Sequence, residues 1–439
     1  MDHIKLIFFK FKIWNFVQQS WPIWYIDATG GVLKRVKGLN KVLLYSVVMH
    51  DKVHKKIIPV AEFFSTGHDA KTIASYLLLI KNELEKSIPK RNFQYTPIIV
   101  TDLSWGLINA VVKTLNNCNF DTYINWCADI ILKKQICKFN IMQSIIVLCY
   151  SHFLKMTACK IKKIKKFNIK KNNQKIHKLG LYCSALLQKA ESIEEFSKIL
   201  KHIYTIFCNK LESREKCSAL QEIKESIFDR SLKLDLNSLV NENKDIHKNI
   251  IYCENRDHKS YTKYSPFTDY FSKIIKNHSK NIHSKRFKLT NLYHKTNHLN
   301  HYYCPQIFKI LNELIHIMPL WSNVLLVLWN SYYNFAIERL TNNPGENWFD
   351  QIKESLKNFL PVMPSQYANF LYSLVEAYFE EFSALKLTSL KKYPDFNNDA
   401  TENWSKGCER IRRQKDFYGA HFTTKNEDVF DNSFASRFN

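Results

Sequence analysis

The sequence has little glycine, no regular cysteine spacing and no long uncharged apolar run. Of 439 residues, 9 are glycine and 11 are scattered cysteines, which argues against a secreted disulfide framework and favours a reducing compartment. No apolar stretch reaches the roughly 18 uncharged residues that span a bilayer. Lysines interrupt the apolar segment Leu6–Trp14, and no small-residue cleavage site follows it. The sequence therefore predicts neither a signal peptide nor a membrane span.

Positive charge is in large excess. There are 64 Lys and Arg residues against 40 Asp and Glu, which gives a formal net charge of +24. Such a charge attracts polyanions, of which nucleic acid is the usual one. A compositionally biased genome is the alternative, because lysine far outnumbers arginine and Asn and Ile are abundant. Hydrophobic residues make up 45% of the chain, so it can build a sizeable core, and its length predicts two or three domains.

Five short apolar runs in the first third of the chain predict β-strands. The first three are joined by short turns, whereas helical patterns separate the later ones. An antiparallel meander followed by parallel crossover strands is typical of a ribonuclease-H-like mixed sheet, so the predicted fold class is α/β. The predicted strands are 24–28, 42–49, 56–64, 97–101 and 144–149.

The second half of the chain differs in composition and predicts a mostly α-helical insertion that splits the sheet domain. Helical spacing marks 181–229 and most of 305–385, whereas the polar stretch 232–300 predicts loops with short helices. The predicted organisation is a partial N-terminal lead-in (1–23), the first part of the core (24–160), a basic helical insertion with loops (161–304), completion of the core (305–385) and a polar, partly disordered tail (386–439).

Two acids follow apolar strand runs. Asp27 and Asp102 end the first and fourth predicted strands, which are parallel neighbours in the expected sheet. Two adjacent carboxylates repel each other unless a divalent cation lies between them, and Mg²⁺ prefers such oxygen ligands. Glu346, at the start of a helix after an Asn-Asn-Pro-Gly turn, is the candidate third ligand; Asp350 and Glu338 are the fallback choices. Alternatively, each acid is a structural turn or helix-cap residue.

Four runs carry a family resemblance: YIDATGGVLK, IIVTDLSWGLINAV, CYSH at Cys149–His152 and TNNPGENWFDQIK at Thr341–Lys353. They resemble the transposases of Mutator-like elements (MULE), whose plan the hAT transposases share. The resemblance covers about residues 24–160 and 305–360. It implies a ribonuclease-H-like core with an Asp-Asp-Glu triad and a helical insertion before the Glu.

On that pattern Asp27, Asp102 and Glu346 are the catalytic residues and hold Mg²⁺ or Mn²⁺. Cys149 and His152 match a Cys-x-x-His pair that helps to order the active site. The resemblance further implies DNA as partner (transposon ends and target), a homo-oligomer and a location in the nucleus. Family members often begin with a zinc-finger domain, and many have a Cys-x-Cys finger near the C-terminus. The chain shows neither, which predicts a truncated or repurposed copy.

A lysine-rich stretch follows the Cys-x-x-His pair. Residues 154–179 contain ten lysines and no acid. A solvated helix face is the ordinary interpretation of such a run. Because this one begins beside the predicted catalytic sheet, it also predicts sequence-independent contacts with DNA phosphates. The candidate DNA-binding residues are Lys155, Lys160, Lys162, Lys163, Lys165 and Lys166.

Several alternatives stay open at this point. Cys149 and His152 also fit half of a zinc site or an ordinary core pair, and His294, His298, His301 and Cys304 have metal-like intervals. The first functional hypothesis is a DNA transposase with a two-metal core for strand cleavage and strand transfer. The second is a domesticated, catalytically inactive protein that binds DNA or protein. A host nuclease with the same core is a third.

Overall fold

The structure is a computed structural model, and it describes most of the chain outside the two ends and several connecting segments. All structural statements below refer to these described residues: 7–8, 22–34, 41–52, 55–87, 98–142, 144–164, 170–230, 232, 264–289, 298–337 and 340–389. The predicted polar tail from 386 lies almost wholly outside them.

Six strands of the described chain form one mixed sheet in the order β1-β4-β3-β2-β5-β6. The strands β2, β3 and β4 form an antiparallel meander, and β5 and β6 continue the sheet in parallel with β2. All five predicted strands are confirmed, as is the parallel pairing of the first with the fourth; only the two-residue β1 was not predicted. The bounds are β1 Ile7–Phe8, β2 Ile23–Thr29, β3 Leu43–Asp51, β4 Lys56–Ser65, β5 Ile98–Thr101 and β6 Ile145–Leu148.

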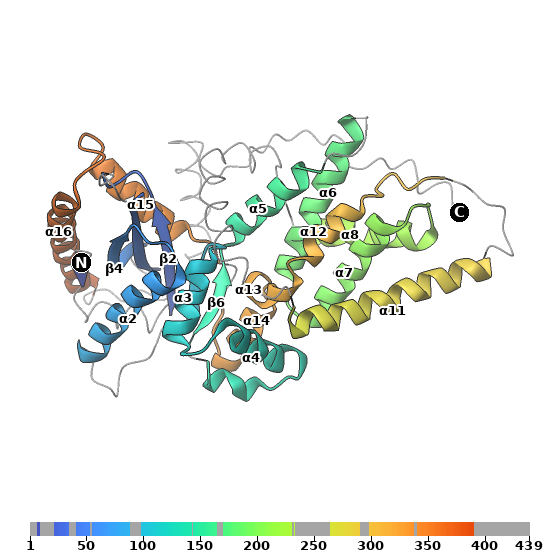
Figure 1. Cartoon of the computed structure of the whole chain (residues 1–439), viewed down its shortest axis with the longest axis horizontal. Coiled ribbons are helices and arrows are strands. Elements are labelled where there is room, and N and C mark those ends of the chain that lie inside the picture. The colour runs from blue at the N-terminus through green and yellow to red at the C-terminus, as the bar shows by residue number, and fades with distance from the viewer. Residues whose placement is uncertain are drawn as a thin grey trace.

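Helices cover both faces of this sheet (Figure 1). On one face lies α2 (Ala70–Ser87), where Phe63 of β4 stacks on Tyr45 of β3 at 4.8 Å and on Tyr76 of α2 at 4.6 Å between ring centroids. Beside α2 lies α3 (Trp105–Leu115). The other face is covered by α15 (Asn343–Ser355), whose Trp348 is fully buried. Because both faces are covered, β2 to β5 are apolar along most of their length.

The remaining helices form the other half of the molecule and its connection to the sheet. Figure 1 shows α6, α7, α8 and α11 at the end of the molecule opposite β4 and α16. One expectation was wrong: the predicted loops with short helices contain α11, a 24-residue helix. The bounds are α4 Phe120–Leu132, η1 Ile136–Asn140, α5 Tyr150–Lys162, α6 Lys170–Lys189, α7 Ile193–Cys208, α8 Arg214–Asp229, α11 Pro266–Leu289, α12 Pro305–Asn312, η2 Ile315–Ile317, α13 Met318–Trp321, α14 Val324–Tyr333 and α16 Pro364–Ser389.

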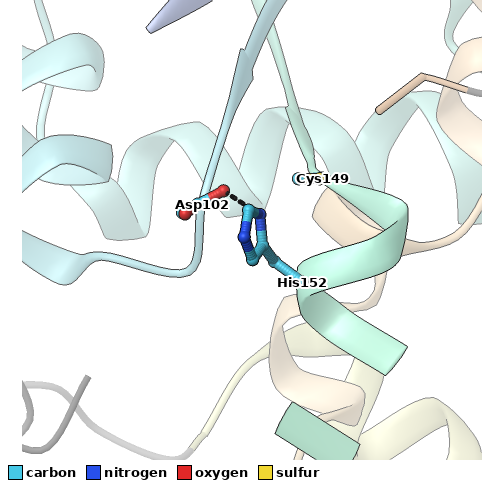
Figure 2. Close-up of side chains that lie close together, drawn as sticks. All are labelled: Asp102, Cys149 and His152. Atoms are coloured by element: carbon cyan, nitrogen blue, oxygen red, sulfur yellow. Dashed lines mark ion pairs between the residues drawn. The ribbon is translucent and has the colours of Figure 1, made fainter. Parts of the chain in front are cut away.

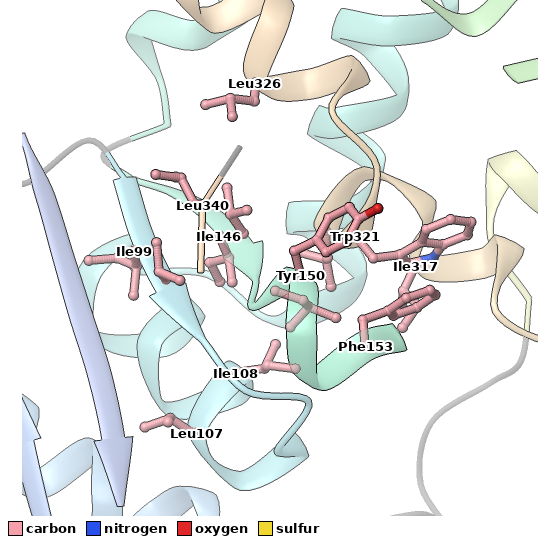
Figure 3. Close-up of a cluster of buried hydrophobic side chains, with 14 of the residues drawn as sticks. Ile99, Leu107, Ile108, Ile146, Tyr150, Phe153, Ile317, Trp321, Leu326 and Leu340 are labelled. Atoms are coloured by element: carbon pink, nitrogen blue, oxygen red, sulfur yellow. The ribbon is translucent and has the colours of Figure 1, made fainter. Parts of the chain in front are cut away.

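One hydrophobic core runs from the sheet into the helical half. Trp321 of α13 stacks on Phe153 of α5 at 4.6 Å and contacts Phe196 of α7 at 5.5 Å, so it joins elements of both halves. Figure 3 shows Trp321 beside Phe153, with Tyr150 between Trp321 and the sheet residue Ile146. The helical segment is therefore packed into the same core as the sheet, and the predicted domain boundaries stay a prediction.

One described segment, Pro305–Tyr333, is long and apolar enough to cross a membrane by length and composition. It is broken into α12, η2, α13 and α14, and 67% of its apolar window is buried inside the protein. That burial is typical of core helices. The expected absence of a membrane partner stays a prediction.

A buried carboxylate lies under α15. Glu62 of β4 is 2% exposed and accepts hydrogen bonds from Ser46 Oγ of β3 at 2.9 Å, from Trp348 Nε1 of α15 and from Tyr367 OH of α16 at 2.6 Å. Burial raises the pKa of Glu62 to about 7, and the three hydrogen bonds only partly offset this. Glu62 therefore links four elements through one ionisable group.

The raised pKa predicts how stability depends on pH. The unfolded chain releases the Glu62 proton near pH 4.5, whereas the folded chain keeps it to about pH 7. Below about pH 4.5 the protonated Glu62 does not reduce the free energy of unfolding. Between about pH 4.5 and pH 7 its contribution to the free energy of unfolding falls by about 3 kcal/mol, and above pH 7 it stays constant. Urea unfolding of the wild type and Glu62→Gln across pH 4.5–8 checks it. A difference between the two proteins that does not change with pH would contradict the prediction.

Candidate active site

Two acids meet at one end of the sheet, where β2 and β5 run in parallel. The register pairs Ile26 with Thr101, so Asp27 and Asp102 take the next positions on neighbouring strands. Asp27 is held by its neighbour Ala28, whose backbone N–H donates to Asp27 Oδ1 at 2.7 Å. Asp102 follows the last residue of β5, where the chain turns towards α3. The predicted pair of neighbouring carboxylates is present.

The third strand of this parallel group supplies Cys149 and His152. Cys149 follows β6, and its N–H donates to Thr101 O at 2.8 Å, which extends the sheet pairing by one position. The chain then enters α5, whose first turn carries His152. Figure 2 shows the His152 ring directed at Asp102, and the distance from His152 Nδ1 to Asp102 Oδ1 is 2.6 Å. The Cys-x-x-His pair therefore lies at the acids.

Glu346 completes the group from the first turn of α15. Its Oε1 lies 3.3 Å from Nε2 of His152, so one imidazole contacts Asp102 on one side and Glu346 on the other. The preceding turn is fixed by the N–H of Asn342, which donates to Cys149 Sγ at 3.2 Å. Of the two fallback acids, Asp350 is exposed on α15, and Glu338 lies outside the described residues. Glu346 is thus the third acid that the structure brings to this site.

Close approach of α15 to β2 depends on a glycine. A Cβ built at Gly345 would lie 3.2 Å from Asp27 Cβ and 3.1 Å from Asn342 Oδ1, which is tighter than nine in ten Cβ contacts. A side chain here would therefore force Asp27 or Asn342 to shift by a few tenths of an ångström. Neither Gly345 nor Glu62 was singled out from the sequence. The signals were present: a glycine immediately before the third acid, and a lone acid inside the apolar run of β4.

The electrostatics of the site reflect this crowding. Burial raises the pKa of Asp27 well above its ordinary value, and the nearby Asp102 carboxylate raises it further. His152 opposes this rise, and Glu346 adds a smaller repulsion. Burial alone would lower the pKa of His152, but Asp102 and, to a smaller extent, Cys149 together outweigh burial, so the pKa of His152 is well above its usual range. The protonated imidazole therefore neutralises part of the negative charge.

The chemistry of the three acids suits a divalent cation. Asp27, Asp102 and Glu346 offer carboxylate oxygens, the ligands that hard cations prefer. Their oxygens are not among the described groups whose ligand atoms all lie within 4.8 Å of one another, so a bound cation would have to draw the three side chains together. Burial is the main cause of the raised pKa of Asp27 and the Asp102 carboxylate adds to it; a divalent cation would offset the repulsion between these acids. The side chain of Asp102 is 31% exposed and that of Glu346 is 20% exposed, so solvent reaches the group.

A softer donor set overlaps with these acids. The ligand atoms of Asp102, Cys149 and His152 all lie within 4.8 Å of one another. Among the described residues, these three form a cluster that is tight enough to hold one metal ion. A zinc site there would use Asp102, which the three-acid site also needs. The other candidate set does not form such a group: His298 and His301 are exposed, Cys304 is buried, and His294 lies outside the described residues.

The predicted DNA-binding lysines divide by exposure. Lys162 and Lys163 are exposed and Lys160 is half-buried at the end of α5, whereas Lys165 and Lys166 lie outside the described residues. Lys155 is 2% exposed, so its ammonium group is not available at the surface. The prediction that Lys155 contacts DNA was wrong, because Lys155 lies on the face of α5 that packs into the core.

No known protein family's sequence profile matches the chain. Among solved structures, the chain resembles the Drosophila P element transposase strand transfer complex, with 13% identity and a TM-score of 0.30, over 82% of this chain and 78% of that chain. That score is too low to establish a shared fold.

Among curated proteins, the chain is similar to a 120.7 kDa protein in the NOF-FB transposable element of Drosophila melanogaster. The two are 24% identical over 342 residues, which cover 75% of this chain and 28% of that protein. The chain thus spans little more than a quarter of the length of this relative. It is weakly related in sequence to a protein in a transposable element.

Proposed function

We propose that this chain contains the catalytic core of a DNA transposase, in which Asp27, Asp102 and Glu346 hold divalent cations for phosphoryl transfer. The observation that supports this most is the contact of one histidine, His152, with both Asp102 and Glu346 beside the half-buried Asp27. These acids come from β2, from the end of β5 and from α15, which are distant along the chain. Structural acids in turns or helix caps have no reason to converge in this way.

The sheet order supports a ribonuclease-H-like fold for this core. An antiparallel meander, β4-β3-β2, is extended in parallel by β5 and β6, and helices lie on both faces. Ligands of α/β sheets bind outside the carboxyl ends of parallel strands, where these acids lie. The related protein in a transposable element supports the assignment of the core to transposition. Membership of the MULE or hAT group is part of the same proposal.

The residues have distinct roles in this proposal. Asp27, Asp102 and Glu346 bind and orient the cations, which supply Lewis acidity and activate a water or a 3′-hydroxyl when bound. His152 partly neutralises Asp102 and Glu346 before a cation enters, and a cation would compete with it for both carboxylates. Cys149 fixes the turn before α15 by accepting the N–H of Asn342, so it keeps Glu346 near the sheet.

DNA would approach along α5. Figure 1 shows α5 leading from β6 at the sheet towards α6, and His152 lies in its first turn. Lys160, Lys162 and Lys163 are at the other end of this helix and lie about 12–17 Å along it from His152, given a rise of about 1.5 Å per residue, where they would contact phosphates. We further propose that the protein acts as a homo-oligomer on transposon ends and target DNA in the nucleus.

Removing any one acid should abolish strand cleavage. Asp27→Asn, Asp102→Asn and Glu346→Gln each remove a charged ligand, and we expect each to reduce Mg²⁺- or Mn²⁺-dependent nicking of a labelled DNA duplex by about a hundredfold or more. Asp350→Asn is the matched control, because Asp350 is an exposed acid on the same helix. Undiminished nicking by the three variants would reject the proposed triad.

Metal titration separates the transposase from a catalytically inactive binding protein with the same fold. Calorimetric titration of the wild type with Mn²⁺ should show binding that Asp27→Asn and Asp102→Asn weaken by about tenfold or more, since each loses one charged ligand. Cys149→Ser should bind Mn²⁺ as the wild type does, because the serine hydroxyl can still accept the N–H of Asn342 and the lost thiol is a poor ligand for hard cations. Binding that depends on Cys149 and not on Asp27 would instead indicate the overlapping zinc-type site.

The exposed lysines of α5 should increase the affinity for DNA of any base sequence. Replacing Lys160, Lys162 and Lys163 by Ala should reduce the slope of log affinity against log salt by up to about 2.7, at about 0.9 per lost phosphate contact. The control replaces Lys273, Lys276 and Lys280, which are exposed on α11 far from the sheet. Equal changes in slope for both triple variants would mean that only net charge matters.

A further inference from the structure

Glu62 belongs to the same row of side chains as the candidate active site. The register pairs Glu62 of β4 with Ser46 of β3, and Ser46 with Asp27 of β2. Residues that pair across strands point to the same face of a sheet, so all three side chains face α15. Two strand spacings, about 10 Å, separate Glu62 from Asp27.

α15 follows this row across the strands and is attached to it at three points. The N–H of Asn342 contacts Cys149 beyond β6, Gly345 packs on Asp27, and Trp348 Nε1 donates to Glu62 Oε1. The three helix positions are three residues apart and so lie on one face. Glu346 lies between the second and third of these contacts.

The bond between Trp348 and Glu62 determines how α15 is rotated about its axis. A rotation of about 20° would move a side-chain tip, about 5–6 Å from the axis, by about 2 Å. The side chain of Glu346 is only 3.3 Å from His152, so such a rotation would break its contact with the site. The hydrogen bond adds a directional restraint to the packing of the buried apolar side chains on this face of α15.

A carboxylate is an unusual choice for this position. The donors to Glu62 described above, Ser46, Trp348 and Tyr367, are all uncharged, and burial raises the pKa of this group, so the acid is costly to ionise in place. Replacing a buried polar group and its partners by an apolar side chain is often neutral for stability. Stability therefore does not account for the acid, whereas directional hydrogen bonding does.

We propose that Glu62 is a positioning residue that holds α15 in the rotation that brings Glu346 to Asp27 and Asp102. The proposal deepens the proposed function and rests on it. Glu62 touches neither cation nor DNA. It acts through Trp348, and Tyr367 of α16 holds its second oxygen.

The test compares Glu62→Leu, Glu62→Gln and Trp348→Phe with the wild type, and Glu354→Gln is the control because Glu354 is exposed on α15. Glutamine still accepts from Trp348, whereas leucine cannot, and phenylalanine keeps an aromatic ring but lacks the N–H. We expect Glu62→Leu and Trp348→Phe to raise the Mn²⁺ concentration for half-maximal nicking by about tenfold or more. Glu62→Gln should restore it to near the wild-type value.

Hydrogen exchange of the α15 amides provides a readout that does not need activity. Faster exchange in Glu62→Leu than in Glu62→Gln, at equal melting temperature, would support the role of Glu62 in holding α15. This readout stays valid if the wild type neither binds Mn²⁺ nor cuts DNA. That second result would reject the proposed function but not the role of Glu62. The positioning role would be overturned if Glu62→Leu had the same Mn²⁺ dependence and the same amide exchange rates as the wild type. It would also be overturned if Glu62→Gln raised the Mn²⁺ concentration for half-maximal nicking as much as Glu62→Leu, because glutamine can still accept the hydrogen bond from Trp348.

Discussion

The contact between the first turn of α15 and the carboxyl end of β2 is the constraint on which the site depends. Without it, Glu346 has no route to Asp27, because the chain between the two leaves the sheet after β6 and passes through the helical half of the molecule. A glycine at 345 permits the approach, and a hydrogen bond from the backbone N–H of Asn342 to Cys149 Sγ fixes the turn. The buried segment from α12 to α14 brings the chain back to the sheet through the shared core.

The three carboxylates at this contact destabilise the folded protein. Three carboxylates in a partly buried place repel each other, and the rise in the pKa of Asp27 expresses that repulsion together with the loss of solvent. One protonated histidine offsets part of it. A protein that gained only stability from these positions would do better with apolar or uncharged residues. The presence of the acids is understandable if cations bind there, as the proposed function requires.

The strands and the two aspartates could be predicted from the sequence because each depends on local pattern. Buried strands are continuous apolar runs, and an acid that follows such a run lies at its end. The position of Glu346 was predicted from its turn and the family resemblance, and the structure brings it to His152. The length of α11 was missed, because its apolar residues are few within a polar stretch, although Phe267, Phe271 and Ile274 have helical spacing. The role of Glu62 could not be predicted either, because its three partners come from distant parts of the chain.

The most direct measurement of the central claim is anomalous diffraction from crystals of the protein grown with Mn²⁺. The account predicts anomalous density among the carboxylates of Asp27, Asp102 and Glu346, with His152 displaced from at least one of them. Anomalous density at Cys149 and His152 but not at the three acids would contradict the account. So would the absence of anomalous density at the acids in a crystal grown in millimolar Mn²⁺ whose site residues are well ordered.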